Sequence, residues 1–233
     1  MPRDFSGYGS LDETDALGVL AEAMDAHRGR IALVSSFGAE AVVLLHLVAR
    51  LDPMTPVLFL ETGMLFPETL DYQKRVADLL GLGDVRVIRP QAGALHDGLH
   101  ATDPDACCAL RKTRPLGTAL LGFDAWITGR KRIHGGQRVS LPVIETDPAG
   151  RTKINPLAEW SATDIETYFS RHPLPRHPLV ERGYASIGCA PCTTRTRDGE
   201  DPRAGRWRGQ DKVECGIHAG PDGRIVRNAE LPA

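Results

Sequence analysis

Short apolar runs alternate with helical stretches through the first half of the chain, and this alternation restricts the fold more than any other feature. The apolar runs predict strands at 30–36, 57–60, 85–88 and 125–129. Helices are expected at 11–28, 41–50, 67–80 and 116–121, and a Ser-x-x-Asp cap predicts another at 162–171. Strands that alternate with helices form a mainly parallel sheet with helices on both faces. We therefore predict a doubly wound α/β fold whose ligands bind at the edge formed by the C-terminal ends of the strands.

Length, composition and charge limit the classes of protein and of partner that this chain fits. The 233 residues suffice for one substantial domain, and the net charge of −2 gives no general attraction for nucleic acid or membrane. No apolar run approaches the roughly 20 residues that span a bilayer, and the N-terminus lacks a basic-then-apolar signal pattern. We expect a cytoplasmic protein with no nucleic-acid or membrane partner.

Beyond residue 195 Gly, Arg, Asp and Pro dominate, so we predict an α/β nucleotide-binding domain at 1–195 and a mobile C-terminal tail at 196–233.

Four of the five cysteines fall into two tight pairs, Cys107-Cys108 and Cys189-x-x-Cys192. In a reducing compartment such pairs favour a metal centre over disulfides. The Cys-x-x-Cys spacing directs two sulfur atoms to one centre. Adjacent cysteines on a helix diverge by roughly 100°, which strains a single zinc ion but suits a larger cluster. Four thiolates favour a [4Fe–4S] cluster; a zinc site and buried free cysteines are the alternatives.

Two further residues belong with these sulfur atoms. Lys112 lies four residues after Cys108, so on a helix both share a face and the ammonium would tune an anionic centre. A solvated basic turn is the alternative. Cys215 follows Arg206 and Arg208, and positive neighbours lower the pKa of a thiol. We therefore predict that Cys215 is a reactive thiolate rather than an inert tail cysteine.

Three loops at the strand ends are candidates for anion binding. Hydroxyls and free amides in Ser35-Ser36-Phe37-Gly38, between a strand and a helix, can seat an anion, although neither the P-loop nor the Gly-x-Gly-x-x-Gly pattern is present. Glu61-Thr62-Gly63 ends the second strand at the same edge. The loop after the fourth strand is rich in guanidinium groups, whose forks match phosphate and sulfate. It carries Arg130, Arg132 and Arg138.

Taken together, these residues resemble the assimilatory adenylylsulfate (APS) reductases, which are relatives of the phosphoadenylylsulfate (PAPS) reductases. The resemblance runs from about Arg30 to His218. Three motifs carry it: Cys107-Cys108-x-x-Arg111-Lys112, Cys189-x-x-Cys192 and Glu214-Cys215-Gly216-Ile217-His218. The last is shared by both reductase types, whereas the cysteine pairs resemble the cluster-containing, APS-using branch. The resemblance implies an adenine-nucleotide α-hydrolase-like fold and a homo-oligomer.

The activity that this resemblance implies has two steps. Cys215 attacks the sulfur of adenosine 5′-phosphosulfate, AMP leaves, and an S-sulfocysteine forms; thioredoxin or glutaredoxin then releases sulfite. A [4Fe–4S] cluster on the four paired cysteines would be structural or electrostatic, because the electrons come from thiols. The implied catalytic residues are Cys215, Lys112 and His218. The substrate-binding set comprises Ser35, Ser36, Phe37, Gly38, Glu61, Thr62, Gly63, Arg130, Arg132, Arg138, Arg206 and Arg208.

Other functions remain open at this point. One is a PAPS-preferring reductase that retains the cluster, and another, of a different class, is a non-catalytic metal-binding nucleotide sensor. An ATP-dependent amidotransferase or tRNA thiolation enzyme is disfavoured. ATP-splitting relatives seat pyrophosphate on Ser-Gly-Gly-x-Asp-Ser, and this chain has Ser36-Phe37-Gly38-Ala39-Glu40 there.

Overall fold

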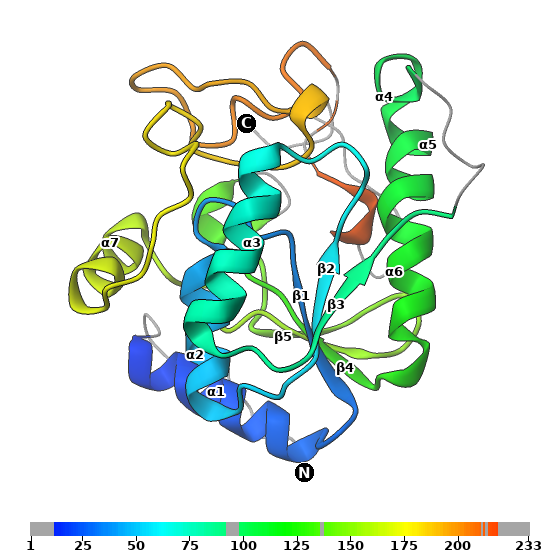
Figure 1. Ribbon diagram of the computed structural model, residues 1–233. Helices are drawn as coiled ribbons and strands as arrows, with labels where there is room; N and C mark the ends of the chain where they lie inside the picture. The colour runs from blue at the N-terminus through cyan, green and yellow to red at the C-terminus, as the bar shows by residue number, and fades with distance from the viewer. Residues whose placement is uncertain (1–11, 92–97, 136–137, 211, 213, 219–233) are drawn as a thin grey trace.

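One six-stranded sheet organises the described part of the chain. The computed structural model describes residues 12–91, 98–135, 138–210, 212 and 214–218. The strands lie in the order β3-β2-β1-β4-β6-β5, and all pairs are parallel except β5 with β6 (Figure 1). Their bounds are β1 Ile31–Ser35, β2 Val57–Leu60, β3 Val85–Ile88, β4 Ala125–Ile127, β5 Ile144–Thr146 and β6 Thr152–Ile154. The predicted mainly parallel α/β sheet is confirmed, and β5 and β6 are additions that the sequence pattern did not indicate.

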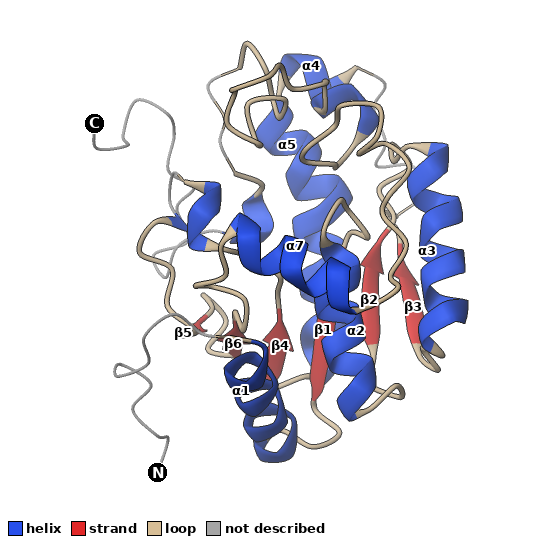
Figure 2. Ribbon diagram, turned by 90° about the vertical axis from the view of Figure 1, so that its left-hand side faces the viewer, coloured by secondary structure: helices blue, strands red, loops and turns tan. Residues whose placement is uncertain are grey.

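The strand order reverses between β1 and β4. From β1 the chain builds outward through β2 to β3, and then returns to place β4 on the other side of β1. Loops that follow β1 and β4 therefore leave the sheet in opposite directions, and a crevice opens between them. Open α/β sheets bind ligands at this switch point. Figure 2 shows the row of strands from β5 to β3, with many of the loops gathered above it, on the side to which the strand arrows point.

Helices cover both faces of the sheet. On one side lie α1 (Glu13–Ala26), α2 (Ala41–Leu51), α3 (Pro67–Leu80) and α7 (Ala162–Arg171). On the other stands a column of α4 (Leu99–Thr102), α5 (Pro104–Cys108) and α6 (Arg114–Ala119), with the π-helical turn η1 (Ala109–Thr113) between the last two (Figure 1). The helices at 67–80 and 162–171 match their predicted bounds. The helical run from 99 to 113 was not predicted.

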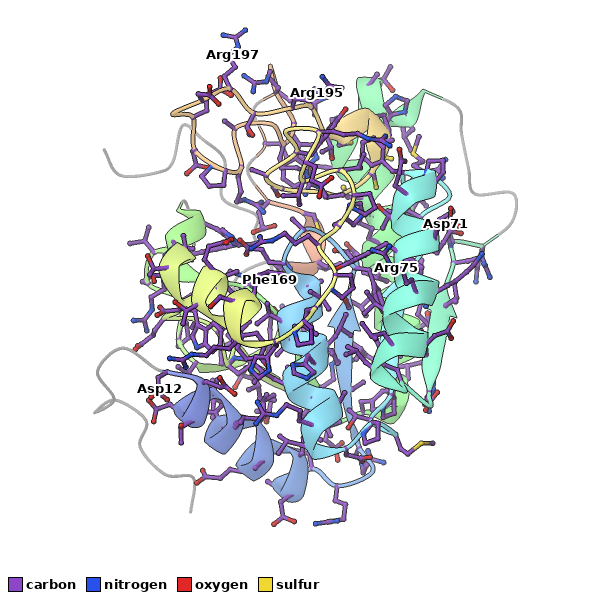
Figure 3. All side chains as sticks on the ribbon, turned by 60° about the vertical axis from the view of Figure 1, so that its left-hand side comes forward. Asp12, Asp71, Arg75, Phe169, Arg195 and Arg197 are labelled. Atoms are coloured by element: carbon purple, nitrogen blue, oxygen red, sulfur yellow. The ribbon has the colours of Figure 1, made fainter. Side chains whose placement is uncertain are left out.

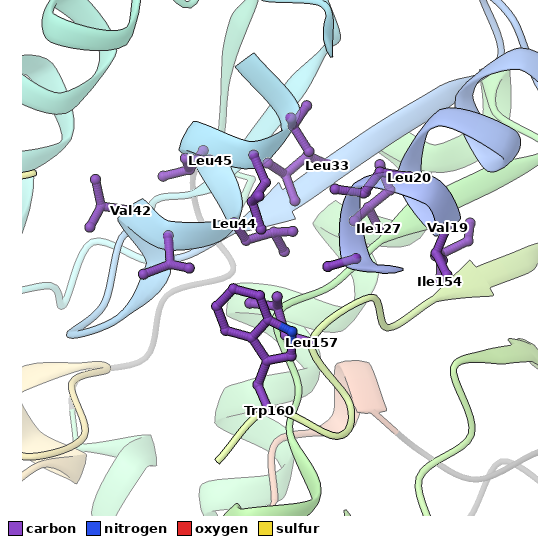
Figure 4. Packing of buried hydrophobic residues seen from close by; sticks show 14 of the residues in the cluster. Val19, Leu20, Leu33, Val42, Leu44, Leu45, Ile127, Ile154, Leu157 and Trp160 are labelled. Atoms are coloured by element: carbon purple, nitrogen blue, oxygen red, sulfur yellow. The ribbon is translucent and has the colours of Figure 1, made fainter. Parts of the chain in front are cut away.

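The strand side chains alternate between two cores. Leu33, Ile127 and Ile154 pack with Leu20 of α1 and Leu44 of α2 (Figure 4). Their strand neighbours point to the opposite face because successive side chains in a strand alternate. Ala32, Leu58 and Trp126 accordingly pack with Leu116 and Leu120 at α6. Each large apolar side chain buried in this way contributes about 1.5–3 kcal/mol, so the two cores hold the strand ends, and with them the loops, in fixed positions.

The chain beyond residue 195 packs against this body. Thr193 and Arg206 form an antiparallel bridge, and the Trp207 N–H donates to the Cys192 carbonyl at 3.1 Å. Arg195 and Arg197 lie exposed on the outside of this region (Figure 3), whereas Trp207 is buried. The mobility of the tail stays a prediction, and its residues 219–233 lie outside the described part of the chain.

None of the described helices has the length and apolar character needed to cross a bilayer.

Candidate active site and cysteine cluster

A cavity lies at the switch point, as predicted for this fold. Part of its wall comes from the loops after β1, β2 and β4, and another part comes from residues of the C-terminal region, among them Arg203, Trp207 and Cys215. The cavity brings together, from the residues expected at the site, Ser35, Ser36, Gly38, Thr62, Lys112, Arg130, Arg138, Arg206, Cys215 and His218. Parallel strands end at one edge of a sheet, so these residues meet although they are distant in sequence.

The loop after β1 turns sharply so that small groups face the cavity. Phe37 has a left-handed φ of 47° and packs edge-to-face on Phe59 with ring centroids 5.2 Å apart. The Ser35 hydroxyl accepts the Phe37 N–H at 3.1 Å and holds this turn. A side chain at Gly38 would meet the Ile187 carbonyl oxygen at 3.1 Å. Phe37 is therefore a core residue that shapes the loop, while Ser36 and Gly38 line the cavity at the N-terminus of α2.

Buried cations line the β4 side of the cavity. Arg130 pairs with Glu145 of β5, and its Nε has no hydrogen-bond partner among the described residues. Burial, together with repulsion from Arg138, lowers the pKa of Arg130 to about 10, which leaves it charged at neutral pH. Lys131 lies beside it and forms an ion pair of 2.8 Å with Glu40 at the start of α2. A buried donor without a partner is suited to an incoming anion.

A buried carboxylate, Glu214, sits among these cations. Its Oε2 accepts from Arg138 Nε at 2.7 Å and from Arg138 Nη2 at 2.6 Å. Its Oε1 accepts the backbone N–H of Cys215 at 3.0 Å and lies 3.6 Å from Nη2 of Arg203. Burial alone would raise the pKa of Glu214, but the two guanidinium groups lower it to about 2. Glu214 is therefore ionised and ties the cysteine backbone to two arginines.

His218 is held on the far side of the same cavity. Its ring stacks nearly parallel on Trp126 with centroids 6.3 Å apart, and the Lys153 ammonium lies 4.7 Å from the centre of that indole ring. Burial and the nearby Arg130 and Lys153 lower the pKa of His218 well below its usual value. The imidazole is therefore neutral at pH 7, and its Nδ1 has no hydrogen-bond partner within the described part of the chain.

Cys215 is a buried free thiol on the wall of this cavity. It is 7% exposed and packs with Cys108 and Trp207 in one small cluster. Trp207 has a φ of 48°, which is unusual for a bulky residue and needs support from its surroundings. The Arg206 guanidinium provides part of that support, 4.5 Å from the ring centre. Cys215 and Trp207 thus pack against the body of the protein in this structure.

The other four cysteines line a second, smaller cavity next to the first. Cys107 and Cys108 end α5, just before the π-helical turn, and Cys189 and Cys192 flank a short 3-10 turn on the opposite wall. The Cys189 sulfur lies 3.2 Å from the Thr62 hydroxyl, which also lines the first cavity. All four are free thiols. The two predicted pairs therefore do meet in space.

This donor set fits a cluster better than a single ion. In the described ranges no three or more His, Cys, Asp or Glu side chains converge closely enough to hold one metal ion. The four sulfur atoms instead surround a cavity, as the ligands of a multi-atom centre do. Burial raises the pKa of the Cys189 thiol, but Lys112 and the Thr62 hydroxyl outweigh it and lower that pKa overall. Burial raises the pKa of the other three thiols, that of Cys108 to about 12, so it is the all-sulfur donor set that suits iron.

Lys112 joins the two cavities, because its side chain lines both. Burial would lower the pKa of this ammonium, but the nearby sulfur atoms of Cys189, Cys215 and Cys108 raise it overall. The predicted proximity of Lys112 to the cysteine pair is confirmed by the geometry. The same ammonium also faces the thiol of Cys215, which sequence spacing alone could not indicate.

Comparisons with known proteins agree with this arrangement. The sequence profile of the phosphoadenosine phosphosulfate reductase domain matches residues 30–195. The chain belongs to this family. It is 47% identical to the adenosine 5′-phosphosulfate reductase of Mesorhizobium japonicum over 91% of this chain and 84% of that protein. The corresponding enzyme of Streptomyces coelicolor is 42% identical over 89% and 90%.

Two further similar proteins are reductases named for the phosphorylated nucleotide, PAPS. The phosphoadenosine 5′-phosphosulfate reductase of Gloeobacter violaceus is 40% identical over 86% of this chain and 87% of that protein. A crystal structure of the Candida auris PAPS reductase in a phosphate complex superposes with a TM-score of 0.67 at 26% identity, covering 77% of this chain and 90% of that one. The chain is thus a reductase of this family, an enzyme that acts on a sulfur group.

Several residues expected to bind substrate lie outside the first cavity of this reductase. Arg132 donates to the Leu141 carbonyl at 2.8 Å and pairs with Glu159. Arg208 is exposed and pairs with Glu200. Glu61 holds the turn at Gly63 by accepting its N–H at 2.6 Å. The geometry gives these side chains local structural contacts, and nothing in it directs them to the cavity.

Sequence reasoning missed other residues that do line the cavity. Glu40, Lys131, His134, Arg203 and Glu214 are all on its wall. Glu214 and His134 stood within motifs that had been singled out, but no local pattern showed that their side chains turn inward. Residues of this kind are usually solvated, and only the fold shows that these line one cavity and that Lys131 and Glu214 are buried.

Proposed function

We propose that this reductase converts adenosine 5′-phosphosulfate to sulfite and AMP, as its relatives' names indicate for those proteins. One observation carries the proposal: a free thiol, Cys215, lies in a cation-lined cavity at the switch point of the sheet, and four other thiols surround the adjoining cavity. The all-thiol chemistry suits the cytoplasm, where cysteines stay reduced.

Binding of the nucleotide would use the loop after β1 and the cations after β4. The hydroxyls of Ser35 and Ser36 and the free amides at the start of α2 supply donors for an anion. Arg130 and Arg138 add positive charge on the opposite wall. The substrate carries both a phosphate and a sulfonyl charge, and a thiolate can approach such an anion only where cations screen the repulsion.

In the first step the Cys215 thiolate attacks the sulfur of the substrate. A sulfur–sulfur bond forms, the bond between sulfur and the bridging oxygen breaks, and its electron pair leaves with AMP. Lys112 and Cys215 line the same cavity, so the ammonium can screen the negative charge that gathers there during the attack. Neutral His218 can donate a hydrogen bond to an oxygen of the transferred group.

In the second step a dithiol reductant, thioredoxin or glutaredoxin, removes the product. One of its thiolates attacks the Cys215 sulfur, sulfite leaves with the electron pair of the sulfur–sulfur bond, and a mixed disulfide remains. The second thiol of the reductant resolves that disulfide and restores Cys215. Because Cys215 is buried, this step requires the segment from 202 to 218 to move away from the body. We expect a homo-oligomer, as in the family.

The four paired cysteines would hold a [4Fe–4S] cluster. When bound, such a group supplies a fixed structure and an electrostatic field, since the electrons of the reaction come from thiols. Cys107 and Cys108 would hold it from α5, and Cys189 and Cys192 from the opposite wall. Lys112 lies between this site and Cys215.

A second candidate is a PAPS-preferring reductase, because one relative at 40% identity carries that name. Steady-state turnover with both nucleotides separates the two. We expect a kcat/KM for APS at least about tenfold above that for PAPS, a difference of roughly 1.4 kcal/mol in transition-state binding. Faster use of PAPS would replace our assignment with the second candidate.

Sulfite release tests the enzyme role itself. The variant Cys215→Ser should lose at least about a thousandfold in rate with APS and thioredoxin, because a hydroxyl is a poor nucleophile at neutral pH. Full activity in this variant would exclude Cys215 as the nucleophile. No sulfite from the unmutated protein would favour the nucleotide sensor instead.

A further inference from the structure

Glu214 is an anion placed where the cavity is otherwise cationic. Its carboxylate is buried and uses two N–H groups of Arg138, at 2.7 and 2.6 Å. Arg203 approaches the other oxygen to 3.6 Å. All three side chains line the cavity that contains Cys215. A buried carboxylate in this position repels any anionic ligand, so its presence cannot be explained by a direct contribution to ligand binding.

The donors that Glu214 occupies are those that an oxyanion would need. A carboxylate and a sulfonyl group both present paired oxygens to a guanidinium fork, and both form short charge-assisted bonds with it. An oxyanion can therefore bind to Arg138 only after the Glu214 carboxylate has released its hydrogen bonds to that guanidinium group. Arg138 itself would keep its orientation during this exchange, because its Nη1 lies 3.1 Å from Nδ1 of His134.

The same carboxylate also holds the nucleophile. Its Oε1 accepts the backbone N–H of Cys215 at 3.0 Å. When Glu214 leaves the arginines, this N–H loses a fixed acceptor and the cysteine backbone is no longer tied to the cavity wall. Occupation of the arginines and release of Cys215 are thus linked through one side chain.

We propose that Glu214 is a positioning residue that stands in for the substrate's anion: it neutralises Arg138 and Arg203 in the empty cavity and yields them to the entering sulfonyl group, which frees Cys215 to move. The identity of that anion rests on the proposed function, but the exchange itself does not. Linkage requires the effect to be mutual: an anion that releases Glu214 loosens the segment of Cys215, and loosening that segment favours the anion.

Binding of inorganic sulfate tests the competition directly. We would measure its dissociation constant by titration calorimetry for the unmutated holoprotein and for Glu214→Gln. The isosteric variant removes the competing charge, so sulfate should bind about tenfold more tightly or better, the size of one charge-assisted hydrogen bond. The matched control Glu200→Gln, at a half-buried carboxylate paired with Arg208 outside the cavity, should bind sulfate as the unmutated protein does. Equal or weaker binding by folded Glu214→Gln would overturn the proposal.

Alkylation of Cys215 supplies a second measurement that does not depend on the variant. Sulfate should increase the rate at which iodoacetamide modifies the peptide that carries Cys215 in the unmutated holoprotein, as followed by mass spectrometry. In Glu214→Gln that rate should already be high and insensitive to sulfate. A rate that sulfate leaves unchanged or lowers in the unmutated protein contradicts the exchange. Neither measurement uses turnover, so a failure to reduce APS would count against the proposed function alone.

Discussion

The five cysteines carry the same functional group but lie in different surroundings. Cys215 lines the first cavity with Lys112 and Glu214, while the other four line a second cavity beside it, and Cys189 lines both. A cysteine in the first position can react with a ligand, and the cysteines in the second can hold one. This separation allows the two roles to be tested independently by single substitutions.

Iron content distinguishes the two roles. Purified without oxygen, the protein should contain about four irons per chain. Cys108→Ser should lose most of that iron and most of its activity, because three thiolates hold a cluster poorly. Cys215→Ser is the matched control, and it should keep the iron while losing activity. One zinc per chain in place of iron would contradict the cluster.

Which residues lie close together could be predicted where spacing alone determines it. The two cysteine pairs and Lys112 are examples, since neighbours along a helix or a short turn remain neighbours in the fold. Arg132 could not be separated from Arg130 in this way. Both follow β4, but Arg132 turns to Glu159 whereas Arg130 faces the cavity. Which of two nearby arginines points inward depends on packing from β5 and β6, which is encoded far along the chain.

At the scale of elements, the loop before Cys189 is fixed by a buried histidine. The Leu179 N–H donates to Nδ1 of His177 at 3.2 Å, so Nε2 carries the proton and donates to the Thr69 hydroxyl of α3 at 3.0 Å. His177 is fully buried, and burial lowers its pKa from 6.5 to about 4. The neutral ring therefore links α3 to the segment that carries the second cysteine pair.

This histidine makes stability depend on pH. Below pH 6.5 the unfolded chain takes up a proton at His177, whereas the folded chain does so only near pH 4. The free energy of unfolding should therefore fall as pH drops from 6.5 to 4, by up to about 3 kcal/mol from this group. Denaturant unfolding of His177→Gln should show a shallower pH slope than the unmutated protein. Parallel slopes for His177→Gln and the unmutated protein would contradict the assignment.

Elements with a strong local signal were predictable and the others were not. The strands at 57–60 and 85–88 and the helix at 67–80, with proline at its start and Gly81 in a left-handed turn at its end, match the sequence expectations. The three-residue strands β5 and β6 carry Glu145 and Lys153 and have no apolar run. They form a strand pair because they extend an existing sheet edge, which a local pattern cannot show.

At the scale of the whole molecule, the fold brings the two cavities together. The order of strands opens a crevice between β1 and β4, the column of α5 and α6 brings one cysteine pair to its side, and Arg203, Trp207 and Cys215 form another part of its wall. The sheet itself was predictable from alternation, but the burial of Trp207 and Cys215 was not, since the composition of that region is typical of a solvated tail. The burial of these two side chains depends on contacts with parts of the chain that are distant in sequence.

Mass spectrometry of the protein after incubation with APS, with no thioredoxin or other thiol present, tests the central claim most directly. The predicted result is a sulfonate-sized mass increase on the peptide that carries residue 215, and its disappearance with release of sulfite when thioredoxin is added. An unmodified Cys215 in a protein that still forms AMP, or the same mass increase on one of the four paired cysteines, would contradict the division between a reacting thiol and a cluster-holding quartet.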